Sequence, residues 1–166
     1  MNAMCDEYLR LSYHGMRARD KGFKSNFESY LDPQMGKVEV VGQDIGRVLL
    51  NLFNNAFYSV REKCKLDIEG YSALVTVTTL RKEKWAEIRI SDNGTGIPMK
   101  VVEKIFQPFF TTKPSGQGTG LGLSLSYDIV KAHGGEIRVE TSENEGSVFT
   151  ILLPADENPA VTKQTS

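Results

Sequence analysis

Apolar residues recur at helical spacing in several segments of the chain. Residues 3–20 predict a helix, and residues 121–132 predict another that ends near Gly134, where glycine favours a helix end. Directly after a proline, residues 99–105 predict a helix of about two turns. The clearest predicted helix spans residues 43–63, with apolar positions at Ile45, Val48, Leu49, Leu52, Phe53, Ala56, Phe57 and Val60.

Alternating and β-branched runs predict strands in the remaining segments. Short turn sequences join residues 23–31 to 37–41, residues 73–80 to 85–91, and residues 136–141 to 147–153, and strands joined in this way pair antiparallel. We therefore expect an α/β (α+β) two-layer sandwich, in which helices cover one face of a mixed, mostly antiparallel sheet. The predicted strands are residues 23–31, 37–41, 73–80, 85–91, 136–141 and 147–153.

Composition and charge narrow the class of protein. The 166 residues suit one domain, and 20 Lys+Arg against 21 Asp+Glu give a net charge of −1, which disfavours nucleic acid as a partner. The two cysteines lie far apart without metal-ligand spacing. No signal peptide and no apolar run of about 18 residues is present, so we expect a cytoplasmic chain without direct membrane insertion. Residues 156–166 predict a disordered polar tail.

Glycines are concentrated where backbone could approach a ligand closely. Eight of the 15 glycines lie between residues 94 and 135. The run over residues 118–123 has the wrong spacing for a dinucleotide fingerprint, and the Gly36-Lys37 pair is followed by valine, not by Ser or Thr. Rossmann-type and P-loop sites are therefore excluded. The remaining candidate functional residues lie in four segments that are separated along the chain.

The first two segments carry amide and carboxylate side chains. Asn51 and Asn55 lie four residues apart on one helix face, which alone is more typical of a solvated stripe but could supply a carboxamide oxygen to Mg²⁺. Asp92 begins an Asp-Asn-Gly sequence after a strand. This sequence could be an ordinary turn, a calcium-loop fragment lacking the necessary downstream carboxylates, or an acceptor for the adenine amino group.

The other two segments are aromatic and glycine-rich. Residues 105–113 contain three aromatics that could anchor a loop to the core, form a lid hinge, or do both. Residues 116–124 run into a predicted helix, whose free N–H groups could bind phosphate. Each segment alone is weak evidence for a site, but the order and spacing of all four are specific.

Together these segments resemble the ATP-binding catalytic domain of sensor histidine kinases, in the wider group of gyrase-type, Hsp90-type and MutL-type ATPases. Residues 51–56 (NLFNNA) resemble its N box, residues 92–96 (DNGTG) its G1 box, residues 106–110 (FQPFF) its F box, and residues 118–123 (GTGLGL) its G2 box. The resemblance covers roughly residues 37–153. It implies the Bergerat fold, with ATP between the long helix and the glycine-rich loop.

The same resemblance implies roles by position. Asn55 would hold Mg²⁺, Asn51 would support the triphosphate and metal shell, and both would be the catalytic residues. Asp92 would bind the adenine amino group, with Gly94 and Gly96 lining the base, and residues 107–117 would form the ATP lid. Gly118, Gly120 and Gly122 would wrap the phosphates. The other nucleotide-binding positions would be Tyr58, Ile97, Phe106, Thr112, Lys113, Thr119 and Leu121.

Two features of the long helix bear on the reaction. The ATPase branches carry Glu at the position of Asn51 to activate water, and an amide cannot act as that base, which favours phosphoryl transfer over hydrolysis. Many relatives also have Lys three residues after the metal-binding Asn, and Tyr next. This chain has Tyr58 and Ser59 there, leaving Lys113 or Arg47 as substitutes for the phosphate-contacting lysine.

The resemblance also implies partners and a domain division. Residues 1–20 would be a helical remnant of an upstream dimerisation or linker segment, and residues 21–155 the ATP-binding catalytic domain. Neither His14 nor His133 has the sequence context of the acceptor. The acceptor histidine would lie on a separate dimerisation domain of a two-component kinase, upstream of a response-regulator receiver domain. A membrane anchor elsewhere in the full-length kinase, an anti-sigma-type serine kinase and a non-catalytic nucleotide-sensing module are left open.

Overall fold

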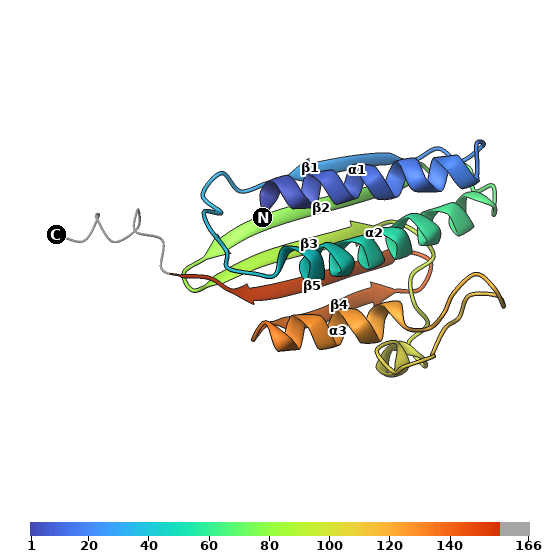
Figure 1. Ribbon diagram of the computed structural model, residues 1–166. Coiled ribbons are helices and arrows are strands. Elements are labelled where there is room, and N and C mark those ends of the chain that lie inside the picture. Colours follow the sequence, from blue (N-terminus) through green and yellow to red (C-terminus); the bar gives the residue numbers. More distant parts are fainter. Residues whose placement is uncertain (157–166) are drawn as a thin grey trace.

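In the computed structural model, which describes residues 1–156, helices cover one face of a five-stranded sheet (Figure 1). The predicted two-layer sandwich is therefore confirmed. No helix within these residues combines the length and apolar character needed to cross a bilayer. Of the predicted tail, residues 157–166 lie outside the described part. The helices are α1 (Asn2–Arg19), α2 (Gly42–Cys64) and α3 (Gly122–Ala132), and the strands are β1 (Asn26–Tyr30), β2 (Leu74–Lys82), β3 (Trp85–Asp92), β4 (Glu136–Ser142) and β5 (Gly146–Pro154).

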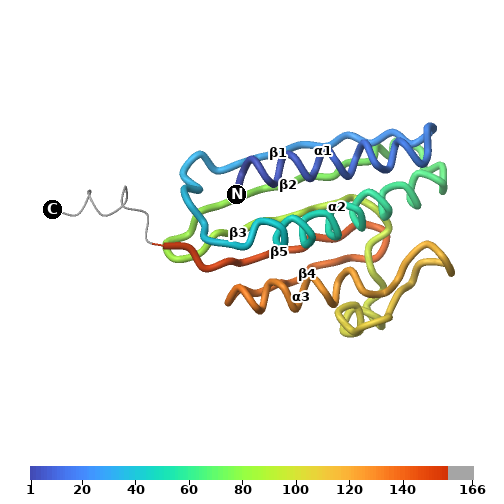
Figure 2. The backbone as a smooth tube through the Cα atoms, viewed as in Figure 1, coloured from blue at the N-terminus to red at the C-terminus, as the bar shows by residue number. Residues whose placement is uncertain are grey.

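The sheet is mixed, as predicted, with the strand order β1-β2-β3-β5-β4. Three of its four strand pairs are antiparallel, while β1 runs parallel to β2 because the chain crosses over through α2 between them. In the register of β3 and β5, Asp92 lies opposite Ser147 at one end and Trp85 opposite Pro154 at the other. The long loop that leads into α3 lies at the end of the sheet where β3 ends (Figure 2), and β3 ends at Asp92.

The core lies between α2 and the inner face of the sheet. All eight apolar residues predicted for this helix are buried, and they face strand residues such as Val77, Ile88 and Ile90. Burying a side chain of this size contributes about 1.5–3 kcal/mol. Helix α1 adds Leu9 to the same cluster. Thus α1 packs as part of this domain, and its origin in an upstream segment stays a prediction.

Two predicted elements are wrong. Residues 37–41 form no strand, because side chains take their backbone groups: Arg81 donates to the carbonyl of Lys37 at 3.3 Å, and His133 accepts from the Val41 N–H at 3.1 Å. Residues 99–105 form only a short 3-10 turn, η1 (Val102–Lys104), because i to i+3 hydrogen bonds close the segment before a longer helix can develop.

His133 has a structural role that can be measured. Its Nε2 accepts from the Val41 N–H and its Nδ1 donates to the Ile129 carbonyl at 2.8 Å, so the ring joins the end of α3 to the start of α2. We expect His133→Ala to lower the unfolding free energy by about 1–2 kcal/mol in urea titrations, since both hydrogen bonds are lost. The exposed His14→Ala is the matched control, and equal stability of the two variants would contradict this role.

Candidate functional site

One face of α2 brings the separated motifs together. Asn51, Asn55 and Ser59 lie four residues apart on this helix, and each contacts a different segment of the chain. The Asn51 Nδ2 donates to the Gly122 carbonyl at 3.2 Å and to the Ser126 hydroxyl at 3.3 Å. This amide therefore fastens the first turn of α3 to the helix face.

The second contact on this face places a cation on an amide oxygen. The Lys113 Nζ donates to the Asn55 Oδ1 at 3.0 Å and lies 4.5 Å from the centroid of the Tyr58 ring. Burial, and then the nearby positive charge of Arg61, lower the pKa of Lys113. A carboxamide oxygen that accepts a hydrogen bond from an ammonium group can also coordinate a hard cation. The environment of Asn55 therefore suits its predicted role as a ligand of Mg²⁺.

The third contact concerns Asp92, at the end of β3. Its buried carboxylate accepts from the Gly94 N–H at 2.9 Å. Burial raises the pKa of Asp92 to about 6. Hydrogen bonds from Gly94, Ser59 and Ser147 and the positive charge of Lys63 favour the ionised form and oppose this shift in part. At neutral pH the group is therefore an anionic acceptor held in a largely dry environment.

The loop after Asp92 approaches α2 so closely that only glycine fits. A Cβ on Gly94 would lie 2.1 Å from the Ser59 Oγ and 2.7 Å from the Val60 nitrogen. The Ser59 Oγ in turn accepts from the Thr95 N–H at 3.0 Å, which ties the loop to the helix. Gly96 adopts a φ of +67°, in the region that glycine favours. These contacts fix the loop as one wall of the site.

We expect Gly94→Ala to lower the unfolding free energy by about 2 kcal/mol or more, because the added methyl group must push the loop away from the α2 backbone. The matched control is Gly15→Ala on α1, where nothing lies within 4 Å of the new Cβ. That variant should gain up to about 1 kcal/mol from helix propensity. Urea unfolding of both variants tests the opposite signs, and a stable Gly94→Ala would contradict the close packing.

The segment between η1 and α3, which contains the predicted lid at residues 107–117, folds back on itself. A Cβ on Gly120 would lie 2.4 Å from the Phe109 carbonyl carbon, and Phe109, at a φ of +66°, leaves its ring 75% exposed. The Phe106 ring centroid lies 5.7 Å from that of Tyr127 on α3, which holds one end of the lid. Thr112, Thr119 and Leu121 are exposed in this segment, and Gly118 lies beside Lys113.

Six of the residues predicted for the site meet at α2. Asn51, Asn55 and Tyr58 belong to the helix, and Gly94, Lys113 and Gly122 contact it from other segments. Ile97 is held instead by the end of β4, where the Thr141 Oγ1 accepts from its N–H at 2.9 Å. The prediction did not include Ser126 and Thr141, although Ser126 follows Gly122 by one helical turn. No pattern in the sequence indicated that Thr141 would meet this loop.

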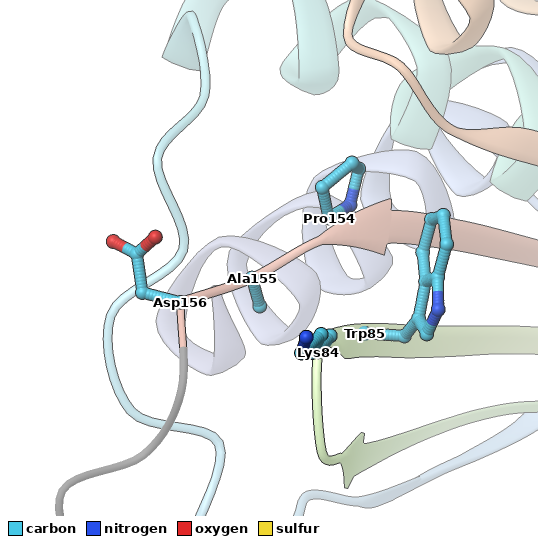
Figure 3. A pocket seen from close by; sticks show the side chains of 5 residues that line it. All are labelled: Lys84, Trp85, Pro154, Ala155 and Asp156. Carbon is cyan, nitrogen blue, oxygen red and sulfur yellow. The ribbon is translucent and has the colours of Figure 1, made fainter.

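A shallow hollow elsewhere on the surface is not part of this arrangement. Figure 3 shows its lining by Lys84, Trp85, Pro154, Ala155 and Asp156. These residues lie at the end of β3 and β5 away from Asp92, as the strand register requires. The site is therefore defined by the face of α2 and the loops at the Asp92 end of the sheet.

Comparison with known families identifies this arrangement. Residues 41–157 match the family HATPase_c, described as "Histidine kinase-, DNA gyrase B-, and HSP90-like ATPase". The chain belongs to this family and is a catalytic domain of the sensor histidine kinase type, as predicted. Domains of this family bind ATP.

Individual relatives agree with this classification. The chain is 37% identical over 155 residues to the signal transduction histidine-protein kinase AtoS of Escherichia coli strain K12, covering 93% of this chain and 23% of AtoS. It is 36% identical over 142 residues to the sensor protein FixL of Bradyrhizobium diazoefficiens, covering 85% of this chain and 26% of FixL. The chain thus spans about a quarter of the length of these relatives.

Solved structures confirm the Bergerat fold. The catalytic domain of the histidine kinase ThkA, in a nucleotide-free form, matches with a TM-score of 0.71 and 30% identity over 94% of this chain and 96% of that one. The mycobacterial sensor histidine kinase MprB matches with a TM-score of 0.70 and 27% identity, covering 92% of this chain and 95% of that chain.

Proposed function

We propose that the chain binds MgATP and transfers the γ-phosphoryl group to a histidine on a separate helical domain. The observation that carries this proposal is the single face of α2, on which Asn51, Asn55 and Ser59 meet the glycine-rich helix start, the lid and the Asp92 loop. Three segments far apart in the sequence meet there, at the positions that the resemblance assigns to phosphate, metal and base.

Each part of the site has a task in this reaction. Asp92 accepts from the adenine amino group, while Gly94 lets the backbone approach the base. Asn55 holds the metal ion, and the N–H groups at the start of α3 face the phosphates. When bound, Mg²⁺ neutralises phosphate charge and orients the γ-phosphoryl group. The work of these residues is positioning and charge stabilisation.

The chemistry of α2 favours transfer over hydrolysis. An amide at position 51 cannot take a proton from water, whereas an incoming imidazole nitrogen is itself a nucleophile and needs no such base. In the proposed step a phosphorus–nitrogen bond forms to the imidazole, and the bond between the γ-phosphorus and the ADP oxygen breaks. The site therefore only has to present the phosphoryl group in line with its acceptor.

The partners follow from this reaction. The acceptor would lie on the histidine-containing dimerisation domain of the same full-length kinase, and a response-regulator receiver domain would take the phosphoryl group next. Both are consistent with the sensor kinases that this chain matches. The proposed reaction would take place in the cytoplasm, where ATP is supplied.

Transfer to a purified acceptor tests the proposal. The chain is mixed with Mg²⁺, [γ-³²P]ATP and a helical hairpin domain that carries the acceptor histidine. We expect label on the hairpin that is labile in acid and stable in base, as phosphohistidine is. Label stable in acid and labile in base would indicate a serine kinase, and nucleotide binding without any transfer would indicate a sensing module. Either result would overturn the proposal.

A further inference from the structure

Lys113 is a lid residue whose ammonium group rests on α2. It contacts two uncharged partners, the Asn55 Oδ1 at 3.0 Å and the Tyr58 ring at 4.5 Å from its centroid. The amide and the ring lie three residues apart on the same face of the helix. Together they form a seat for one cation.

This cation has no counter-charge within the described residues. Lys113 makes no ion pair among residues 1–156 although its side chain is partly buried. The charged group nearest in effect is another cation, Arg61, which lies 5.5 Å from the centroid of the same Tyr58 ring and pairs with Glu62. An unpaired, partly buried ammonium is unfavourable, so the seat favours the arrival of an anion.

The Asn55 oxygen cannot serve two cations at once. Mg²⁺ binds its oxygen ligands at about 2.1 Å, which would place it next to the ammonium group, and the two positive charges would repel each other. A lysine side chain is long and flexible enough to leave without any change in α2. Its nearest favourable destination would be the phosphate chain of the same nucleotide.

We propose that Lys113 is the cation that binds the phosphate chain in this site, held on Asn55 and Tyr58 until Mg²⁺ takes the amide oxygen and the ammonium moves to a phosphate. This proposal rests on the proposed function. It gives Tyr58 a task as the support of the lid lysine. It also makes Lys113 the residue that links metal binding to contact between the lid and the nucleotide.

Calorimetry with a non-hydrolysable ATP analogue and with adenosine tests the proposal. In the presence of Mg²⁺, Lys113→Met should weaken binding of AMP-PNP by about 10- to 100-fold, the value of one charge-assisted hydrogen bond. Adenosine has no phosphate, so its affinity should be unchanged. The matched control is Lys100→Met, an exposed lysine on the approach to the lid, which should bind both ligands like the wild type.

A second variant separates charge from lid structure. Because the Tyr58 ring lies against the Lys113 ammonium, a lysine at position 58 would place its own ammonium group near the same seat. We therefore expect Tyr58→Lys, added to Lys113→Met, to recover at least about tenfold in AMP-PNP affinity. If Lys113 only fastens the lid, the second substitution will recover nothing.

The contact between Lys113 and Asn55 in the nucleotide-free protein can also be measured directly. In nucleotide-free protein, the side-chain amide resonance of Asn55 should differ between the wild type and Lys113→Met, and saturation with Mg²⁺ and AMP-PNP should remove most of that difference. Equal AMP-PNP affinity of wild type and Lys113→Met would overturn this inference alone. Failure of the wild type to bind AMP-PNP at all would overturn the proposed function as well.

Discussion

Replacing Asn55 with alanine is expected to abolish the dependence of nucleotide binding on Mg²⁺ and to lower the rate of phosphoryl transfer by about three orders of magnitude. The amide oxygen of Asn55 is the group that holds a cation on the α2 face, and the metal contributes several kcal/mol to stabilising charge in the transition state. Calorimetry with AMP-PNP in Mg²⁺ and in EDTA measures the first effect, and transfer of ³²P to the hairpin domain measures the second.

The neighbouring asparagine supplies a matched control. Asn54 is exposed and directly precedes Asn55, so Asn54→Ala removes the same chemical group from the same helix one residue away from the proposed metal ligand. This variant should bind and transfer like the wild type. If the two variants behave alike, or if Asn55→Ala retains full Mg²⁺ dependence, the assignment of the metal to Asn55 is wrong.

Asp92→Asn should weaken nucleotide binding while stabilising the fold. The carboxylate offers two acceptor oxygens, whereas the amide replaces one of them with a donor. That donor would face either the Gly94 N–H or the adenine amino group, both of which are donors themselves. We expect affinity for ADP to fall by about 100-fold, measured by calorimetry at pH 7.5.

The stability effect follows from the buried charge. Burial raises the pKa of Asp92 from its ordinary value of 3.8 to about 6 in the folded chain, so between pH 4 and 6 the folded state binds more protons than the unfolded state. The wild type therefore loses stability as pH rises through this window, by up to about 3 kcal/mol. Asparagine stays neutral, so the variant should be more stable than the wild type above pH 6 and similar to it near pH 4.

Urea unfolding at several pH values tests this prediction, with the exposed Asp128→Asn on α3 as a control that should change neither binding nor stability. A pH-independent difference between the Asp92 variant and the wild type would contradict the raised pKa. An Asp92→Asn variant that binds ADP normally would show that this carboxylate does not recognise the base.

Strong periodicity explains which parts of the fold could be predicted. The eight apolar residues predicted for α2 are all buried, because a 23-residue helix repeats its pattern over many turns. Residues 37–41 alternate in the same way as a strand, yet Arg81 and His133 take up backbone groups there. Long-range contacts of this kind decide the structure of short segments, and no local pattern reports them.

In the candidate site, too, local spacing could be predicted from the sequence and long-range contacts could not. Spacing of four along α2 is visible in the sequence, so Asn51 and Asn55 could be assigned to one face before any coordinates were known. Which segment each amide meets depends on how the chain returns from far along the sequence. The contact between Lys113 and Asn55 spans 58 positions, and the contact between Thr141 and Ile97 spans 44.

The central claim is that separated segments form one MgATP site on α2, and calorimetric titration of the chain with AMP-PNP tests it most directly. In Mg²⁺ the account predicts binding of one nucleotide per chain, which weakens strongly when EDTA removes the metal. Absence of binding, or binding of the same strength with and without Mg²⁺, would contradict it.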